Sequence, residues 1–185
     1  MDVPNEENDK SMQLVLAGDL AMVREKYIEV IEHTKDMNIH ARWIYGQHPS
    51  DTLIQTYIDR KEMYLLMDGQ NVAGMTAITM YQGEDYREVL WSQSLKDDEV
   101  ASLHILTVVP EYQGKGVSKK MMEEVISLAM EKGKKAIRLD TLASNIPAQH
   151  MYEKLGFEYR GKQNLYAENT GWTDFLYYEL PLGNI

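Results

Sequence analysis

A glycine-bearing turn in the middle of the chain has the residue types of a phosphate-binding site. The apolar stretch 101–109 leads toward Gly114-Lys115-Gly116, and an amphipathic helix is predicted to begin directly afterwards, at Val117. Such a turn aims backbone N–H groups and the positive end of a helix at one point, where a phosphate group is stabilised. The sequence therefore predicts an anion site over residues 114–119.

An amide and a phenol follow this turn along the chain. Asn145 and Tyr152 lie seven positions apart, at a helix that is predicted to run from Pro147 to Lys154. A phenol has a pKa of ~10 and a departing thiolate one of ~8.5, so a proton can pass between them at modest cost. A phosphate site beside a positioned phenol indicates a transferase whose donor carries a diphosphate. The alternative for Tyr152 is packing between helix and sheet.

The glycine turn departs from two common nucleotide-binding motifs. A Walker loop requires Gly-Lys followed by Ser or Thr, whereas this chain has Gly116 there. A dinucleotide fingerprint requires glycine in place of Lys119 and no intervening residues such as 110–113. These departures disfavour a dinucleotide-dependent oxidoreductase. A plain strand-to-helix turn without a ligand is the other alternative.

Two segments taken together resemble the GCN5-related N-acetyltransferase (GNAT) family. They are Q-G-K-G-V-S at 113–118 and N-I-P-A-Q-H-M-Y-E-K-L-G-F at 145–157. The family's loop pattern is Arg or Gln, two residues, Gly, one residue, then Gly or Ala; Gln113 and Gly116 match it, and Ser118 departs from it. The resemblance covers residues 14–180 in element order and is specific across 103–157. Serine can still donate a hydrogen bond to a phosphate, so the departure concerns loop packing more than cofactor binding.

The resemblance implies acetyl-CoA as the acyl donor and a set of residues that bind it. In the family, one strand edge pairs with the pantetheine arm through its main chain, and a bulge in that strand turns an amide toward the thioester carbonyl. The glycine turn would hold the pyrophosphate, and Asn145 would lie on the pantetheine side. The implied cofactor-binding residues are Leu106, Thr107, Val108, Gln113, Gly114, Lys115, Gly116, Val117, Ser118, Lys119, Asn145 and Tyr152, of which Tyr152 would also be the general acid.

The general base has two candidates. An ammonium acceptor, with a pKa near ~10.4, must lose a proton before it attacks the thioester. Asp140 stands near the end of the strand predicted over 136–142, where some family members carry a catalytic carboxylate. His104 lies on the strand that would border the reacting carbon, and histidine titrates near neutrality. A structural role is the alternative for each.

Composition narrows the classes of function. The chain has 185 residues, a formal net charge of −10 and no cysteine. An acidic protein is a poor partner for nucleic acid, although it attracts cationic amines. Without cysteine, a cysteinyl acyl-enzyme and disulfides are impossible, which favours direct attack in a ternary complex. The histidines show no metal-ligand spacing, so no metal is expected; no signal peptide or membrane span is readable, so a cytoplasmic protein is expected.

The predicted fold is a mixed α/β (α+β) fold, in which helices flank a twisted, mostly antiparallel sheet. Residues 1–11 are predicted to be a flexible acidic tail and residues 12–182 a single GNAT-like domain. Strands 101–109 and 136–142 should run parallel at the centre, because a helix connects them, and the resemblance implies that they splay apart. Residues 82–99 are predicted to form a loop or a small excursion. The remaining elements are predicted as helices near 20–34 and 51–58 and strands near 63–67, 72–81, 157–166 and 174–180.

The leading hypothesis is an acetyl-CoA-dependent N-acetyltransferase that acts on a primary amine of a small molecule or peptide. Its alternative is an acyl-CoA-binding module without turnover, with a sensor or regulatory role. No motif identifies the acceptor, although Trp43, Tyr45 and Trp172 are candidates for the wall of its pocket. The acidic run 97–99 could attract a cation or form a solvated loop. The oligomeric state is left open, a homodimer included.

Overall fold

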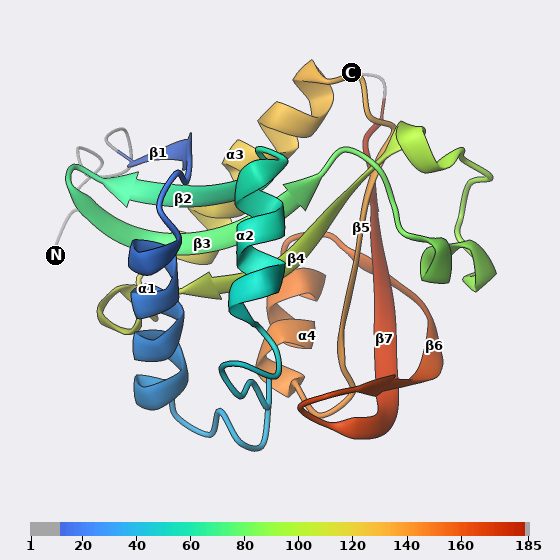
Figure 1. Ribbon diagram of the computed structural model, residues 1–185. Helices are drawn as coiled ribbons and strands as arrows, with labels where there is room; N and C mark the ends of the chain where they lie inside the picture. Colours follow the sequence, from blue (N-terminus) through green and yellow to red (C-terminus); the bar gives the residue numbers. More distant parts are fainter. Residues whose placement is uncertain (1–11, 184–185) are drawn as a thin grey trace, which may run out of the picture.

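A computed structural model describes residues 12–183, and its seven strands form one sheet in the order β1-β2-β3-β4-β5-β7-β6 (Figure 1). Every neighbouring pair is antiparallel except β4 and β5, which are parallel. This confirms the predicted mixed fold. The strands are β1 (Met12–Leu16), β2 (Met63–Asp68), β3 (Asn71–Thr79), β4 (Val100–Val108), β5 (Ala136–Leu142), β6 (Glu158–Ala167) and β7 (Gly171–Pro181). The expected tail, 1–11, lies outside the described residues.

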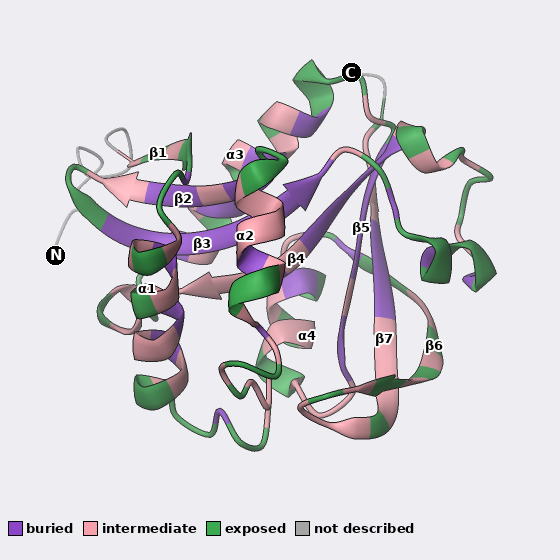
Figure 2. Ribbon diagram, in the orientation of Figure 1, coloured by how far each residue is buried: buried purple, intermediate pink, exposed green. Residues whose placement is uncertain are grey.

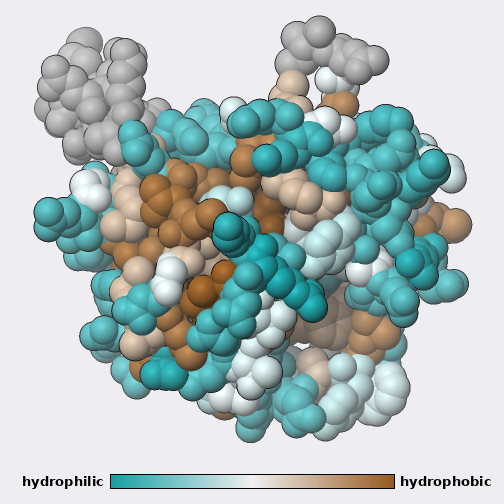
Figure 3. Space-filling view, turned by 45° about the horizontal axis from the view of Figure 1, so that its top comes forward, coloured by the Kyte–Doolittle hydropathy of each residue, from teal (hydrophilic) through white to brown (hydrophobic). Residues whose placement is uncertain are grey.

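Four α-helices cover the two faces of this sheet. They are α1 (Leu20–His33), α2 (Asp51–Asp59), α3 (Val117–Glu131) and α4 (Ile146–Lys154), and three 3₁₀ turns are η1 (Glu84–Glu88), η2 (Asp97–Glu99) and η3 (Pro110–Tyr112). α1 and α2 lie on one face and α3 and α4 on the other (Figure 1). Figure 2 shows the middle strands as the most buried part of the molecule. Figure 3 shows a face that is largely hydrophilic, with a larger apolar area to the left of its centre and smaller ones toward its right edge.

Helix starts follow local side-chain chemistry, with one exception. Asp19 caps α1 by accepting a 2.9 Å hydrogen bond from the amide of Ala21, and Ser50 caps α2. Asn145 caps α4 by accepting from the amide of Ala148 at 3.3 Å. α3 instead follows Gly116, whose backbone is left-handed and which offers no capping side chain. The first N–H groups of α3 therefore lack the side-chain acceptor that the other α-helices have.

β4 and β5 pair only at their starts. Their register joins Val100–Ser102 to Ala136–Arg138, and beyond these residues the strands diverge (Figure 1). The later part of β4 keeps its pairing with β3 through Gly74 and Met75. Its other edge has no strand partner within residues 12–183. The predicted splay is confirmed, and it leaves main-chain groups in the later part of β4 without a strand partner on that edge within the described residues.

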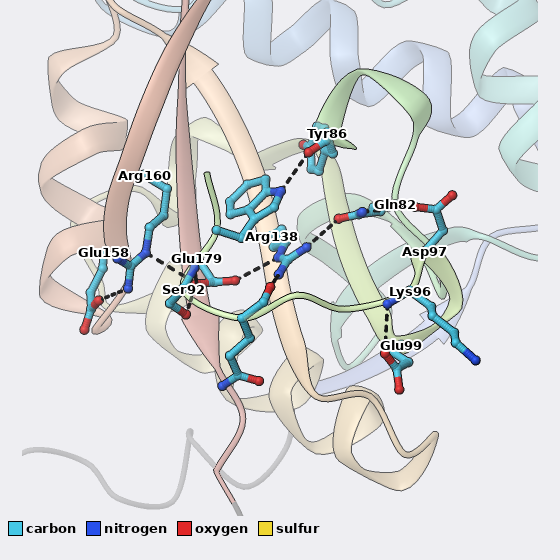
Figure 4. Close-up of polar contacts among 12 residues, drawn as sticks. Gln82, Tyr86, Ser92, Lys96, Asp97, Glu99, Arg138, Glu158, Arg160 and Glu179 are labelled. Carbon is cyan, nitrogen blue, oxygen red and sulfur yellow. Dashed lines mark hydrogen bonds and ion pairs between the residues drawn. The ribbon is translucent and has the colours of Figure 1, made fainter. Parts of the chain in front are cut away.

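The excursion between β3 and β4 is tied down by a buried arginine (Figure 4). The Arg138 side chain on β5 is 1% exposed and donates to Glu179 at 2.8 Å. It also donates to the side chain of Gln82 and to the carbonyl of Gln93, at 2.8 Å each. Its guanidinium carbon lies 4.4 Å from the ring centroid of Trp91. The predicted loop is thus an anchored segment that carries η1 and η2.

Candidate functional site

A cavity of about 480 Å³ lies along the open edge of β4 and the glycine turn. We call it the turn cavity. The predicted cofactor-binding residues that line it are Leu106, Thr107, Val108, Gln113, Gly114, Gly116, Val117, Ser118 and Asn145. Lys115, Lys119 and Tyr152 do not line it; the Lys115 amine lies 6.0 Å from the ring centroid of Tyr112. The structure therefore gathers nine of the twelve predicted residues around one opening.

The glycine turn is held open by its backbone conformation. Gly114 and Gly116 have φ values of 74° and 77°, which L side chains rarely adopt. A Cβ placed on either residue would meet no atom within 4 Å. Glycine is thus favoured here by the turn, while the space in front of it stays free. Together with the uncapped start of α3, this forms a surface that can hold an anion through backbone N–H groups.

Gln113 joins the turn to the strand and to the end of α1. Its Nε2 donates to the carbonyl of Val108 and to Oγ1 of Thr34, both at 3.1 Å. The side chain therefore crosses from the turn to the other wall of the cavity. Because Gln113 already donates to the Val108 carbonyl, this oxygen has one lone pair fewer to offer to a ligand that lies along β4.

A bulge interrupts the pairing of β4 with β3. Ala77 pairs with His104 and Met75 with Thr107, so Ile105 and Leu106 stand opposite one residue of β3. Ile105 has a φ of 46°, which is strained for a β-branched residue. The buried hydroxyl of Tyr27 donates to the Ile105 carbonyl at 2.7 Å and stabilises this geometry. The bulge re-aims the backbone of Leu106.

A second cavity, of about 350 Å³, adjoins the first. We call it the Asp140 cavity. Both cavities are lined by Ala41, Trp43, Leu106, Asn145, Ala148 and Met151, so they share a wall and a junction. The second is also lined by Asp140, His104 and Tyr152. All three candidate catalytic residues thus surround one space, next to the glycine turn's cavity.

Tyr152 is one of the buried residues that line this space. Its ring packs against Phe157 and Tyr178, with centroid distances of 5.7 and 6.1 Å. The hydroxyl has no hydrogen-bond partner among the residues that the structure describes. Burial, and then the negative charge of Asp140, raise the pKa of Tyr152 well above its usual value. The phenol therefore keeps its proton at neutral pH and is free to donate it to a ligand.

Asp140 is a carboxylate in apolar surroundings. Its Oδ2 accepts a 2.6 Å hydrogen bond from the hydroxyl of Tyr86 in η1. Burial raises the pKa of Asp140 to about 6, Asp85 adds to the rise, and the hydrogen bond from Tyr86 opposes it. The group is therefore charged at neutral pH but can accept a proton more readily than an ordinary aspartate.

His104 is half-buried and neutral. Burial, followed by the nearby His48, lowers the pKa of His104 to about 4. Its Nε2 lies 3.2 Å from Oγ1 of Thr79, which donates its own proton to the carbonyl of Tyr81 at 2.7 Å. Nε2 must then be the donor in its contact with Thr79. The ring stacks on Tyr57 with a centroid distance of 5.8 Å.

Other candidates from the sequence have different surroundings. Of the three aromatic residues proposed for an acceptor wall, Trp43 lines both cavities, whereas Tyr45 bonds Asp51 at 2.6 Å and Trp172 is 72% exposed. Asp97 in the acidic run is paired with Arg87 and Gln82. Within residues 12–183, no three His, Asp or Glu side chains are placed to share a metal ion, and no helix is long and apolar enough to cross a membrane.

Sequence reasoning did not find Tyr86, Tyr57 or Asn169 at this site. Tyr86 belongs to a polar stretch with no periodicity, and Tyr57 reads as one residue of an amphipathic helix. Asn169 lies at the turn between β6 and β7. Tyr57 and Asn169 line the Asp140 cavity, and Tyr86 reaches it through its hydrogen bond to Asp140. Each is brought there by contacts between segments that lie far apart in the sequence. No local signal marks them.

Comparisons with known proteins identify relatives of this arrangement. A model of the acetyltransferase (GNAT) family matches residues 28–157. The chain is 32% identical to the ribosomal-protein-bS18-alanine N-acetyltransferase of Escherichia coli over 83 residues, which make up 44% of this chain and 56% of that protein. The chain spans 24% to 56% of the length of such curated relatives.

Solved structures share the fold over most of the chain. A GNAT-family acetyltransferase from Streptococcus agalactiae superposes with a TM-score of 0.71 at 21% identity, covering 94% of this chain and 96% of that one. The spermidine N-acetyltransferase of Vibrio cholerae, solved with CoA and spermine, gives a TM-score of 0.63 at 16% identity, with 93% and 96% covered. At these identities the likeness shows the fold.

Proposed function

Because the chain belongs to the acetyltransferase (GNAT) family, we propose that it is an N-acetyltransferase that carries an acetyl group from acetyl-CoA to a primary amine by direct attack in a ternary complex. The observation that carries this proposal is the pair of adjoining cavities. One has the chemistry of a diphosphate and pantetheine site, and the other holds Asp140 and Tyr152. Leu106 lies at their junction, where the reacting carbon would be.

The turn cavity fits acetyl-CoA by its own residues. We assign the pyrophosphate to the backbone of 114–119 at the uncapped start of α3, with Lys115 and Lys119 near enough in sequence to add positive charge at its rim. The pantetheine arm would pair with residues 106–108, as an added strand does on an open sheet edge. A protein with a net charge of −10 needs such local dipoles to hold an anion.

The bulge and Tyr152 would stabilise the negative charge that develops during transfer. When bound, acetyl-CoA supplies an activated acyl group and a thiolate leaving group. We assign the Leu106 N–H to the acyl oxygen, since a fixed amide aimed at a developing oxyanion is effective in a site that excludes water. Tyr152 would donate to the sulfur as it leaves. Its raised pKa keeps the phenol protonated at neutral pH and also makes it a weaker acid, so full proton transfer to the thiolate costs more than from an ordinary tyrosine.

We assign the acceptance of the amine's proton to Asp140 rather than to His104. A protonated amine is cationic and pairs with a carboxylate, whereas His104 is neutral and uses Nε2 as a donor to Thr79. An ammonium has a pKa of ~10.4, far above that of Asp140, so only a small fraction of the bound amine gives its proton to Asp140. Asp140 therefore acts best by accepting the proton as the attack proceeds.

The single domain, 12–182, the cytoplasmic location and a homodimer stay predictions from the sequence.

A thiol-release assay with a panel of primary amines tests this function. We expect the purified chain to release CoA only when both acetyl-CoA and a suitable amine are present, with the N-acetyl product found by mass spectrometry. Calorimetry on the same sample measures CoA binding. Tight CoA binding with no turnover of any amine would favour the acyl-CoA-binding module. If neither CoA binding nor turnover is found, both hypotheses are wrong.

A further inference from the structure

The Asp140 cavity has the size of a small-molecule site. Its volume of about 350 Å³ is near the lower end of the range for drug-sized ligands. Its walls come from four separate parts of the chain: the 41–57 region, β4, the β5–α4 segment, and the β6–β7 hairpin. A space built from so many elements has a defined shape. It can select its occupant by charge as well as by size.

The lining of this cavity carries a negative charge at a single residue, Asp140. Asp140 is the one acidic residue among those that line it, and no lysine or arginine does. Burial lowers the pKa values of His48 and His104, so both are neutral at pH 7. Tyr57 and Tyr152 have raised pKa values and stay protonated. At neutral pH the cavity therefore carries one negative charge.

One guanidinium stands at the rim of this cavity. Arg42 donates a long, 3.4 Å hydrogen bond to the carbonyl of Thr170, which is one of the lining residues. Arg42 itself lines a separate cavity, together with Glu32 and Asp36, and is not among the residues that line this one. The lining of the Asp140 cavity within the described residues thus supplies no cation to pair with an anionic ligand. A ligand carboxylate there would be buried beside Asp140.

One acceptor atom of Asp140 has no donor. Tyr86 occupies Oδ2 of Asp140, while Oδ1 has no hydrogen-bond partner within residues 12–183. An unsatisfied acceptor in a pocket is matched by a ligand with N–H donors. A primary ammonium group has three.

The rest of the wall is apolar. Trp43, Tyr57 and Phe175 present aromatic surface, and Leu53 and Met151 present aliphatic surface. Burying hydrocarbon against such walls stabilises a complex by roughly 25 cal/mol for each Å² removed from water. The ligand should therefore carry a hydrocarbon or aryl part beside its amine.

From these features, and resting on the proposed function, we infer that the acceptor is a small alkyl or arylalkyl primary amine that bears no carboxylate or phosphate. The amine nitrogen faces Asp140, and the hydrocarbon part packs on Trp43, Tyr57 and Phe175. In the reaction the nitrogen lone pair forms the new C–N bond, the C–S bond breaks with its electron pair on sulfur, and the amine's proton leaves toward Asp140. A free amino acid is rejected because its carboxylate would be unpaired in the same space.

Matched pairs of substrates test this inference. The enzyme is assayed with 2-phenylethylamine against L-phenylalanine and with 3-methylbutylamine against L-leucine, which differ only in the carboxylate. We expect kcat/KM to be at least ~100-fold higher for each amine, since a like charge at close range costs several kcal/mol. L-Phenylalaninamide is the control: it has the size of the amino acid without its charge. It should be acetylated far better than L-phenylalanine.

Each other outcome has a distinct meaning. Equal or better turnover of the amino acids would overturn the inference and leave the acetyltransferase activity intact; loss of that turnover in Arg42→Gln would then show that Arg42 binds the carboxylate. Strong preference for a tetrapeptide amide beginning with Phe over 2-phenylethylamine would also overturn it, in favour of a peptide acceptor. If CoA binds but no compound is acetylated, the proposed function itself fails and takes the inference with it.

Discussion

The hydroxyl of Tyr86 donates a 2.6 Å hydrogen bond to Oδ2 of Asp140, and so joins the β3–β4 excursion to the candidate site. Two residues earlier on β5, Arg138 holds the same excursion through Gln82 and Gln93 (Figure 4). Residues at i and i+2 of a strand face the same side. One face of β5 therefore makes both sets of contacts with the excursion: Arg138 binds Gln82 and Gln93, and Asp140 accepts the hydrogen bond from Tyr86.

Replacing Tyr86 by Phe should move the acidic limb of the pH–rate profile upward. In the wild type the pKa of Asp140 is raised to about 6, and the hydrogen bond from Tyr86 limits that rise by stabilising the carboxylate. Its loss favours the protonated form, so the pKa rises and the active carboxylate appears only at higher pH. We expect a shift on the order of one pH unit in kcat/KM, the equivalent of one hydrogen bond.

Tyr177→Phe is the matched control for this shift. Tyr177 packs in the same aromatic cluster, with its ring centroid 5.3 Å from that of Tyr86. Its own hydroxyl is buried and makes no hydrogen bond. Removing that hydroxyl should leave the profile in place. An equal shift in both variants would assign the effect to packing and contradict a specific role for Tyr86.

Replacing Arg138 by Met should destabilise the protein strongly. The substitution leaves Glu179 buried with fewer partners, and loss of one member of a buried ion pair typically costs about 3–5 kcal/mol. Arg160 and Ser92 still contact Glu179, so the lower end is expected. Urea unfolding measures the change. The double variant Arg138→Met, Glu179→Leu should recover part of it; further loss in the double variant would show that the charge pair is not the cause.

Replacing Gly116 by Trp should weaken CoA binding at least ~10-fold, because the indole fills space that the pyrophosphate needs. A side chain at a positive φ also costs about 1 kcal/mol of stability. Gly133→Trp is the control for that strain, since Gly133 has a φ of 72°, a Cβ there would meet nothing within 4 Å, and it lies beyond the other end of α3. Calorimetry with CoA should separate the two variants. Equal affinity in both would move the phosphate site elsewhere.

The glycine turn and Asn145 could be predicted because their signals are local. A strand, a turn with glycines and a helix follow one another without interruption, and Asn145 caps the next helix three residues before its partner amide. The order of the larger elements followed from hydrophobic periodicity, and the parallel pair from the strand–helix–strand unit and the resemblance to the family. Secondary structure and motif position are thus encoded over short stretches.

The remaining parts of the site depend on contacts between distant segments. Tyr86 and Asp140 are 54 positions apart, and nothing around Tyr86 signals its destination. β1 was missed because it is a five-residue edge strand, whose stability comes from pairing with β2 some fifty residues later. The charge balance at Asp140 likewise requires knowing that Arg42 lines another cavity and only reaches the rim of this one. Such features appear only when the sheet is assembled.

Replacing Tyr152 by Phe should lower turnover far more than CoA affinity. Phenylalanine keeps the ring contacts with Phe157 and Tyr178, so packing is preserved while the proton donor is lost. General acid catalysis contributes typically ~10²–10⁴-fold, and the low end is expected because water can replace part of the donor's role. The change should appear in kcat, since the hydroxyl acts only as the thiolate departs.

The measurement compares kcat and the CoA dissociation constant for both proteins at several pH values, with 2-phenylethylamine as acceptor. Tyr159→Phe is the control, because Tyr159 packs on the same Tyr178 ring at 5.8 Å but is 51% exposed and lines neither cavity. It should behave as the wild type. If chemistry limits the wild-type rate and Tyr152→Phe keeps its kcat, the proton donor is not this phenol, and a water held near Asp140 becomes the group to test.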